Sequence, residues 1–309
     1  MKQISRKCIS FLMLLLFFSN NLFAFGMTRK KVSSSKTSSS NNPTNATHPT
    51  TIPSSPDSQY VEYIKDLAAS SACSKYSWKN RGRAPVGYIK GVALSFARSL
   101  CRLKRVDEHS TLSIHTILAK ASGSSQKDAL SHYSSQFQFL DLKINEGGEE
   151  PLKAIYVLGM GLGMRESSGK YCTGWDTSAG SNRSSSAAEA GVFQVSFDSI
   201  GASSELVKLY REYQASDPSR CFLSTFKEGV NCGSQSILGT GAGAEFQKFL
   251  KSCPAFATEY AMVLLRVLRK HFGPINRKEA EVISSCNNLL ASIQDIIERD
   301  TIYACTDIN

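Results

Sequence analysis

Several catalytic signatures are missing from this sequence. It has no GxSxG segment, no HExxH segment and no CxxC pair, which argues against a serine hydrolase or a metallohydrolase. No apolar run reaches the roughly 20 residues that a transmembrane helix needs. Basic and aromatic residues do not interleave in the way that favours RNA or DNA binding. We therefore expect no metal or other cofactor, no membrane span and no nucleic-acid partner.

The first 24 residues have the composition of a secretory signal peptide. Lys2, Arg6 and Lys7 form a positive start, and residues 9–18 form an apolar run that is too short to span a bilayer. Ala24 offers a cleavage site. We therefore expect the mature protein to be secreted or periplasmic.

The stretch that follows, residues 25–58, consists mainly of Ser, Thr, Asn and Pro. It cannot bury a core and is predicted to be a disordered, basic tether. The formal charge of the whole chain is +10, and the predicted signal and tether carry most of it, leaving about +4 on residues 59–309. This modest positive charge suits an anionic polymer as substrate but does not identify one.

Nine cysteines are present, and Cys8 leaves with the predicted signal. An even number then remains in an oxidising compartment, which predicts four disulfides in the mature protein. The spacing does not give their connectivity. Cys221 with Cys232 is a plausible local pair.

Residues 59–309 are long enough for one domain with a sizeable core, and their apolar pattern is helical nearly throughout. Strand patterns are scarce, and there is no internal repeat. Helices are predicted over residues 60–72, 87–103, 111–121, 128–137, 152–166, 205–214, 244–251 and 255–271, and residues 277–303 are predicted to contain a long last helix. The sequence therefore predicts a mainly α domain stapled by disulfides, and we expect it to be a monomer.

Glu166 stands near the end of the most apolar of these helices, and Gly169 is a plausible stop. The negative end of the helix dipole and an apolar wall both disfavour an ionised carboxylate there. Such a side chain should keep its proton toward neutral pH, as a general acid must. A Glu in a last helical turn is more often solvated, so position alone would not decide its role.

Two motifs support the catalytic interpretation. Residues 166–169 (ESSG) resemble the Glu-Ser-x-Gly motif of lytic transglycosylases and goose-type lysozymes, and residues 191–194 (GVFQ) are similar to the Gly-Leu-Met-Gln motif that follows it there. The fuller pattern GMRESSGKYC…AEAGVFQVS resembles a bacterial secreted branch of this lysozyme-like superfamily, and the resemblance covers roughly residues 85–280. It implies a helical lysozyme-like fold with a cleft, and cleavage of β-1,4 bonds in peptidoglycan between N-acetylmuramic acid and glucosamine sugars, with Glu166 as the acid.

The second catalytic group is less clear. Asp176 lies in a Ser- and Gly-rich loop, residues 174–188, and could hold a water, or it could be a turn residue. Goose-type lysozymes carry a carboxylate where this chain has Ser196, which leaves hydrolysis and the transglycosylase route with its 1,6-anhydro product both open. Glu189 is interpreted as a helix-end or loop residue. If Asp176 or Glu189 faces the substrate, either could pair with the ammonium of deacetylated glycan.

Several further side chains are candidates for substrate binding. Hydroxyl and amide groups are predicted to bind sugar substituents or to cap the local backbone, and aromatic rings to stack on sugars or to pack in the core. One phenol, Tyr260, resembles a late-helix tyrosine of transglycosylases, but the match is a single residue and packing is the more common role. These candidates are Ser167, Tyr171, Phe193, Gln194, Ser196 and Tyr260, with Trp175 as another ring. A different class of function also remains open, namely a catalytically silent wall-binding or inhibitory module that keeps the cleft.

Overall fold

The computed structural model describes residues 59–105, 114–177, 182–233 and 235–309. The predicted signal peptide and tether, residues 1–58, lie outside the described residues, as does the start of the helix predicted over residues 111–121. The described residues all belong to one compact unit and are mainly helical, as the sequence predicts.

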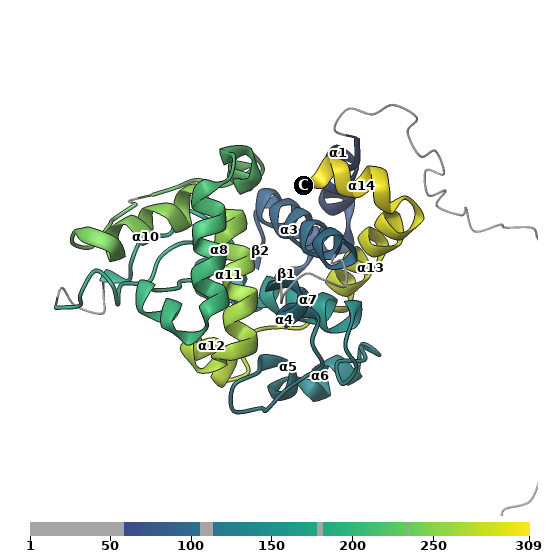
Figure 1. The fold of residues 1–309 in the computed structure, drawn as a ribbon, viewed down its shortest axis with the longest axis horizontal. Coiled ribbons are helices and arrows are strands. Elements are labelled where there is room, and N and C mark those ends of the chain that lie inside the picture. Colours follow the sequence, from purple (N-terminus) through teal and green to yellow (C-terminus); the bar gives the residue numbers. More distant parts are fainter. Residues whose placement is uncertain (1–58, 106–113, 178–181, 234) are drawn as a thin grey trace, which may run out of the picture. The chain divides into compact units, whose positions relative to one another are not determined.

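Helices follow one another along most of the described chain (Figure 1). The first elements are α1 (Gln59–Ser70), α2 (Ala72–Lys75), β1 (Ser77–Trp78), β2 (Gly82–Arg83) and α3 (Val86–Lys104). The next are α4 (Ile114–Ala119), α5 (Ala129–His132), α6 (Ser134–Gln138), α7 (Glu149–Ser167) and the 3-10 helix η2 (Phe197–Ala202). Then come α8 (Ser204–Ala215), η3 (Pro218–Cys221), α9 (Leu223–Lys227), α10 (Gly241–Ser252) and α11 (Pro254–Val267). The last are η4 (Arg269–His271), α12 (Gly273–Asn276), α13 (Ser284–Arg299) and α14 (Thr301–Ile308).

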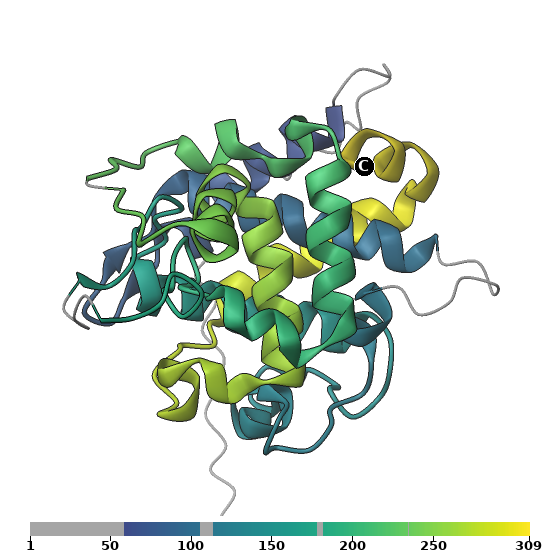
Figure 2. The same ribbon diagram turned by 60° about the vertical axis from the view of Figure 1, so that its left-hand side comes forward.

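Three helices, α3, α7 and α11, form the centre of this unit. Each contacts the other two, and each is buried over most of its length rather than along one stripe. The helices α1, α13 and α14 pack against α3, while α8 and α10 pack against α11 (Figures 1 and 2). The apolar runs of the sequence therefore mark the helices that are covered by others on several sides.

Helix α7 is surrounded closely because three glycines let neighbouring parts of the chain approach its backbone. A Cβ at Gly159 would lie 2.3 Å from the Met262 side chain of α11, and one at Gly161 would lie 2.2 Å from the Glu281 carbonyl oxygen. A Cβ at Gly163 would lie 2.3 Å from the Tyr88 hydroxyl of α3. Since real Cβ atoms do not approach so closely, the glycines set the distance of α7 from its neighbours.

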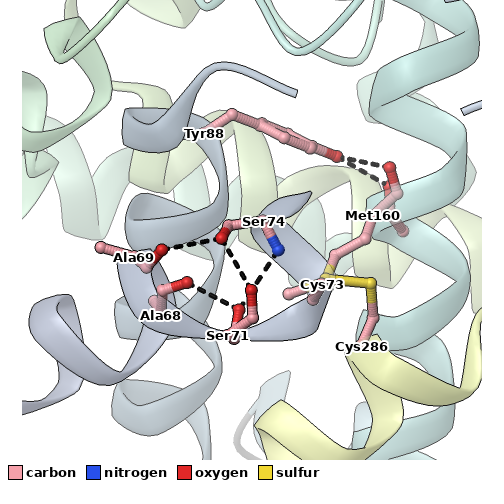
Figure 3. Close-up of a disulfide and its surroundings, with 9 residues drawn as sticks. Ala68, Ala69, Ser71, Cys73, Ser74, Tyr88, Met160 and Cys286 are labelled. Atoms are coloured by element: carbon pink, nitrogen blue, oxygen red, sulfur yellow. Dashed lines mark hydrogen bonds between the residues drawn. A yellow bond between two sulfur atoms is a disulfide. The ribbon is translucent and has the colours of Figure 1, made fainter. Parts of the chain in front are cut away.

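The close-up in Figure 3 shows one of these contacts beside a disulfide. The Tyr88 hydroxyl donates hydrogen bonds to the main-chain carbonyls of Met160, at 2.8 Å, and Gly159, at 3.2 Å. The Cys73–Cys286 bridge lies next to Met160 and joins α2 to α13. The helix that carries Glu166 is thus held from its middle by a buried tyrosine.

Two helix ends in the structure are set by contacts that the sequence pattern does not show. The helix predicted over residues 255–271 ends at Val267, because the main-chain N–H of Arg269 donates to the Lys127 carbonyl instead, at 2.8 Å. The long last helix predicted within residues 277–303 is confirmed as α13, which begins at Ser284 and ends before Asp300, whose carboxylate accepts a hydrogen bond from the Tyr60 hydroxyl at 2.6 Å. Both helix ends depend on hydrogen bonds with residues that are distant in the sequence.

All eight cysteines of the described chain form disulfides, which confirms the predicted number. The pairs are Cys73–Cys286, Cys101–Cys305, Cys172–Cys232 and Cys221–Cys253. Four disulfides are typical of a protein that matures in an oxidising, extracellular or periplasmic compartment. Among the residues that the structure describes, no helix is long and apolar enough to cross a membrane.

The predicted pair of Cys221 with Cys232 is wrong. Helix α9 lies between these two cysteines and packs against α3, where the ring of Phe226 fills the space above Gly91. This contact separates the two sulfurs, so that Cys221 pairs with Cys253 before α11 and Cys232 pairs with Cys172 after α7. The latter bridge fixes the start of the Ser- and Gly-rich loop.

Candidate active site

Glu166 lies in the last turn of α7, as predicted, and a left-handed turn follows it directly. Ser168 and Gly169 have positive φ angles of 55° and 74°. Their main-chain N–H groups donate to the carbonyls of Met164 and Gly163, both at 3.1 Å. The turn therefore satisfies the terminal carbonyls of the helix and leads the chain away sharply after the acid.

Ser167 connects the two sequence motifs. Its hydroxyl donates to the Gly163 carbonyl at 3.1 Å and lies 2.7 Å from the Val192 carbonyl of the second motif. The side chain is buried. Ser167 was predicted to bind substrate, but its hydroxyl is used within the protein, so we assign it the role of joining the acid-bearing helix to residues 191–194.

The second motif forms a tight turn. The main chains of Ala190 and Val195 pair in an isolated antiparallel bridge, and Gln194 between them has a φ angle of 48°. The Gln194 amide nitrogen donates to the carbonyls of Gly191, at 2.9 Å, and Gly174, at 3.4 Å. Within the described chain, the amide oxygen of Gln194 accepts no hydrogen bond, so it remains available to a substrate N–H or O–H.

The turn places Glu189 close enough to Glu166 to change its titration. Burial is the main reason why the pKa of Glu166 is raised to about 8, and repulsion from the Glu189 carboxylate is the next. The positive charges of Arg277, Arg81 and Arg165 oppose this shift without reversing it. Glu166 therefore holds its proton at neutral pH, as the sequence predicts for a general acid.

The arginines near Glu166 are held in place by one another and by an acid. Glu279 accepts hydrogen bonds from Arg277, at 2.8 and 3.1 Å, and from Arg165, at 3.1 Å. Arg81, from the turn between β1 and β2, donates to the Arg165 carbonyl. These hydrogen bonds, that of Arg277 first, lower the pKa of Glu279 to about 2. Because Glu279 stays ionised, it offsets part of the positive charge that would otherwise ionise Glu166.

Glu189 has its own neighbours. The Nε2 atom of His271 lies 4.0 Å from a Glu189 carboxylate oxygen, and 35% of the Glu189 side chain is exposed. This buried nitrogen has no hydrogen-bond partner among the described residues. Burial raises the pKa of Glu189, Arg183 opposes the shift and Asp176 adds to it. Burial also lowers the pKa of His271, although a hydrogen bond to the Gln194 main chain acts against this.

Asp176 belongs to the outer part of this acid cluster. Its side chain is exposed and raises the pKa of Glu189, but it is not among the charges that shift Glu166. Asp176 was predicted as the second catalytic group, whereas Glu189 is the acid whose charge raises the pKa of Glu166. Glu189 is the residue that the sequence analysis interpreted as a helix-end or loop residue, because no local pattern marks it as functional.

Several predicted binding residues face the interior. Phe193 is completely buried in the hydrophobic core, and so is Tyr260, whose hydroxyl shares a hydrogen bond with Ser199 at 2.8 Å. Ser196 is buried and its carbonyl accepts from the Ser199 hydroxyl at 2.6 Å. We therefore assign Phe193 and Tyr260 to packing, because their side chains are completely buried and leave no open face for a sugar.

The two other aromatic candidates lie in the loop after α7. Tyr171 is 7% exposed, and burial raises the pKa of its phenol. Trp175 is half-buried, next to Asp176. The described part of the loop over residues 174–188 contains no strand, in agreement with the prediction of a loop rather than a sheet. Trp175 is thus the aromatic side chain of this loop that is most open to a ligand.

The site combines a protonated carboxyl, a second carboxylate with a histidine beside it, and an available amide oxygen. Such a set can donate a proton to a leaving oxygen and accept one from a nucleophile. No group of three or more His, Cys, Asp or Glu side chains within the described ranges could hold a metal ion. Comparison with protein-family models, curated proteins and solved structures finds no match for this chain.

Proposed function

We propose that this chain is a secreted glycosidase of the lysozyme-like superfamily that cleaves peptidoglycan. The observation that carries the proposal is the raised pKa of Glu166, about 8, in a helix end that also lies next to the Glu189 carboxylate. A wall-binding module without turnover would have no use for a carboxyl held protonated at neutral pH. The order and spacing of the two motifs support the same function, since Ser167 joins them directly.

In the proposed reaction, Glu166 gives its proton to the glycosidic oxygen as the bond from that oxygen to the anomeric carbon breaks. A water molecule attacks the anomeric carbon, and Glu189 takes the proton that this water loses. His271 lies beside Glu189 and can orient its carboxylate. Glu166 is left ionised, and a proton returned through solvent from Glu189 restores both groups, so that the net change is hydrolysis of one glycosidic bond.

The acids also bear on substrate choice. Asp176 and Glu189 are the acidic residues between Glu166 and Gln194, and the structure brings them close to each other electrostatically. Two carboxylates beside the cleaved bond favour a sugar that carries an ammonium over one that carries an acetamide. We therefore expect the enzyme to accept deacetylated glycan.

Digestion of purified peptidoglycan tests the function. Fully acetylated and deacetylated walls would be incubated with the mature protein, and the products analysed by mass spectrometry. We expect products with reducing ends and cleavage of the deacetylated wall. Products with 1,6-anhydro ends would assign the transglycosylase route instead, and an intact wall after digestion of both substrates would overturn the enzymatic function.

The substitution Glu189→Gln should lower turnover by about 10²–10⁴-fold, because it removes the proposed general base. It should also shift the alkaline limb of the kcat/KM profile to lower pH. This limb reports the ionisation of Glu166, and the Glu189 charge is the second cause of its raised pKa. The measurement is a pH–rate profile of the variant and the wild type.

Arg277→Gln serves as the matched control for the direction of this shift. The positive charge of Arg277 lowers the pKa of Glu166, so its removal should move the alkaline limb to higher pH. If the alkaline limb of the kcat/KM profile stays at the same pH in both variants, the charges of Glu189 and Arg277 do not affect the pKa of Glu166. This result would remove Glu189 from the proposed site.

A further inference from the structure

A pocket of about 420 Å³ lies apart from the acid cluster. Its volume is within the range of roughly 300–1,000 Å³ that is usual for small-ligand sites. Tyr171, Ile237 and Ser252 form parts of its wall, together with the side chains of three lysines, Lys227, Lys248 and Lys251. Neither Glu166 nor Glu189 lines it.

The charge of this lysine pocket is unbalanced. No acidic side chain of the described chain lines it. Lys248 pairs with Glu245 on its own helix, at 2.8 Å, and both side chains are more than half exposed. Lys227 and Lys251 form no ion pair with the described residues. The pocket therefore offers two to three ammonium groups to an anion.

Lys251 is the most unusual of the three, because it is only 6% exposed. Its ammonium donates to the main-chain carbonyls of Gln235, at 3.0 Å, and Ser236, at 3.4 Å. Burial lowers the pKa of Lys251. A cation that is buried without a carboxylate partner is costly, and an anionic ligand in the pocket would offset this cost.

The pocket shares a loop with the candidate active site. Tyr171 in its wall lies five residues after Glu166, and the Cys172–Cys232 bridge ties this loop to the segment that contains Gln235 and Ile237. On the same loop, the Gly174 carbonyl accepts a hydrogen bond from Gln194 of the active-site turn. The pocket wall and the active-site turn are therefore linked through one loop by a disulfide and a hydrogen bond.

We propose that the lysine pocket binds carboxylates of the peptide stems that branch from the glycan strand. This inference rests on the proposed function, which supplies a substrate with such stems. Peptide stems carry several carboxylates on a flexible chain, which suits a pocket of spaced ammonium groups that is separate from the site of bond cleavage. The pocket would then distinguish peptide-bearing glycan from bare glycan.

The test compares intact peptidoglycan with the same glycan after its peptides have been removed by an amidase. The double variant Lys227→Gln/Lys248→Gln should lose about three- to tenfold in kcat/KM on the intact polymer, as expected for two exposed ion pairs, and should be unchanged on the peptide-free glycan. Lys143→Gln/Lys208→Gln removes the same charge from exposed positions outside the pocket and should behave as wild type on both. An equal loss on both polymers, or no loss on either, would overturn the proposal.

Direct binding separates the pocket from the activity. Calorimetry with the free stem peptide should show binding to the wild type, weaker binding to Lys227→Gln/Lys248→Gln, and weaker binding again when the peptide carboxylates are amidated. If the peptide binds but no glycan is cleaved, the enzymatic function fails while the pocket stands. If inorganic phosphate binds as tightly as the peptide, or the peptide does not bind at all, the peptide assignment is overturned.

Discussion

Replacing Glu166 by glutamine should lower turnover on peptidoglycan by about 10²–10⁴-fold while the protein stays folded. Glutamine has nearly the same shape as protonated glutamate but cannot donate the proton that the leaving oxygen needs. Turnover would be measured by release of soluble muropeptides from purified walls. Glu62→Gln is a suitable control, since Glu62 lies on α1 and is mostly exposed. A folded Glu166→Gln protein with near wild-type turnover would exclude Glu166 as the acid.

The same variant should become more stable than the wild type at alkaline pH. Burial raises the pKa of Glu166 from 4.5 to about 8, so the folded state binds this proton more tightly than the unfolded state does. The resulting stabilisation is complete below pH 4.5 and is lost as the pH rises through about 8. Glutamine has no such proton to lose, and the difference in unfolding free energy should reach the order of a few kcal/mol above pH 8, since one pKa unit corresponds to about 1.4 kcal/mol.

Urea unfolding of both proteins between pH 4 and pH 9 measures this difference. Two stability curves that run parallel over the whole range would mean that Glu166 titrates normally in the folded protein. The stability measurement needs no substrate. It therefore tests the electrostatics of the site separately from the proposed reaction.

Removal of the Cys73–Cys286 bridge should cause a large loss of stability. This bridge closes a loop of 213 residues. Cys101–Cys305 still joins the same two regions of the chain. Removing Cys73–Cys286 therefore frees a loop of only a few tens of residues in the unfolded state, and the unfolding free energy should fall by roughly 3–4 kcal/mol. The variant is Cys73→Ala/Cys286→Ala, and the measurement is the unfolding free energy without reductant.

Thiol titration provides the control for this variant. The mature wild-type protein, unfolded but not reduced, should show no free thiol, since each of the eight described cysteines has a partner. Two or more free thiols would contradict the four-bridge structure. A Cys73→Ala/Cys286→Ala protein as stable as the wild type would show that the second bridge alone supplies the constraint.

The parts of the fold that the sequence predicts well are those governed by local patterns. The helix predicted over residues 152–166 is observed as Glu149–Ser167, because its apolar residues continue on every side and its glycines leave room for neighbours. Glu166 was found for the same reason, since its position relative to the helix end can be counted along the chain. The raised pKa follows from burial, which the apolar flank already indicates.

The parts that could not be predicted depend on contacts between distant residues. Helix α11 ends at Val267, where the next turn of the chain bonds to the Lys127 carbonyl, and helix α13 ends before Asp300, which bonds to Tyr60. The cysteine pairs depend on where α9 packs, which spacing does not reveal. The importance of Glu189 depends on a turn that brings it toward Glu166, and a single acidic residue in a Ser- and Ala-rich segment gives no local sign of this.

The bridges Cys73–Cys286 and Cys101–Cys305 have a consequence for the covalent topology of the domain. Each joins the beginning of the described chain to its end, so that residues 101–286 lie within a ring closed by sulfur. A single cut of the backbone inside this ring opens it without releasing a fragment, since both halves stay attached through the bridges. After a single cut of this kind, the two halves of the domain can separate only when both bridges are also reduced.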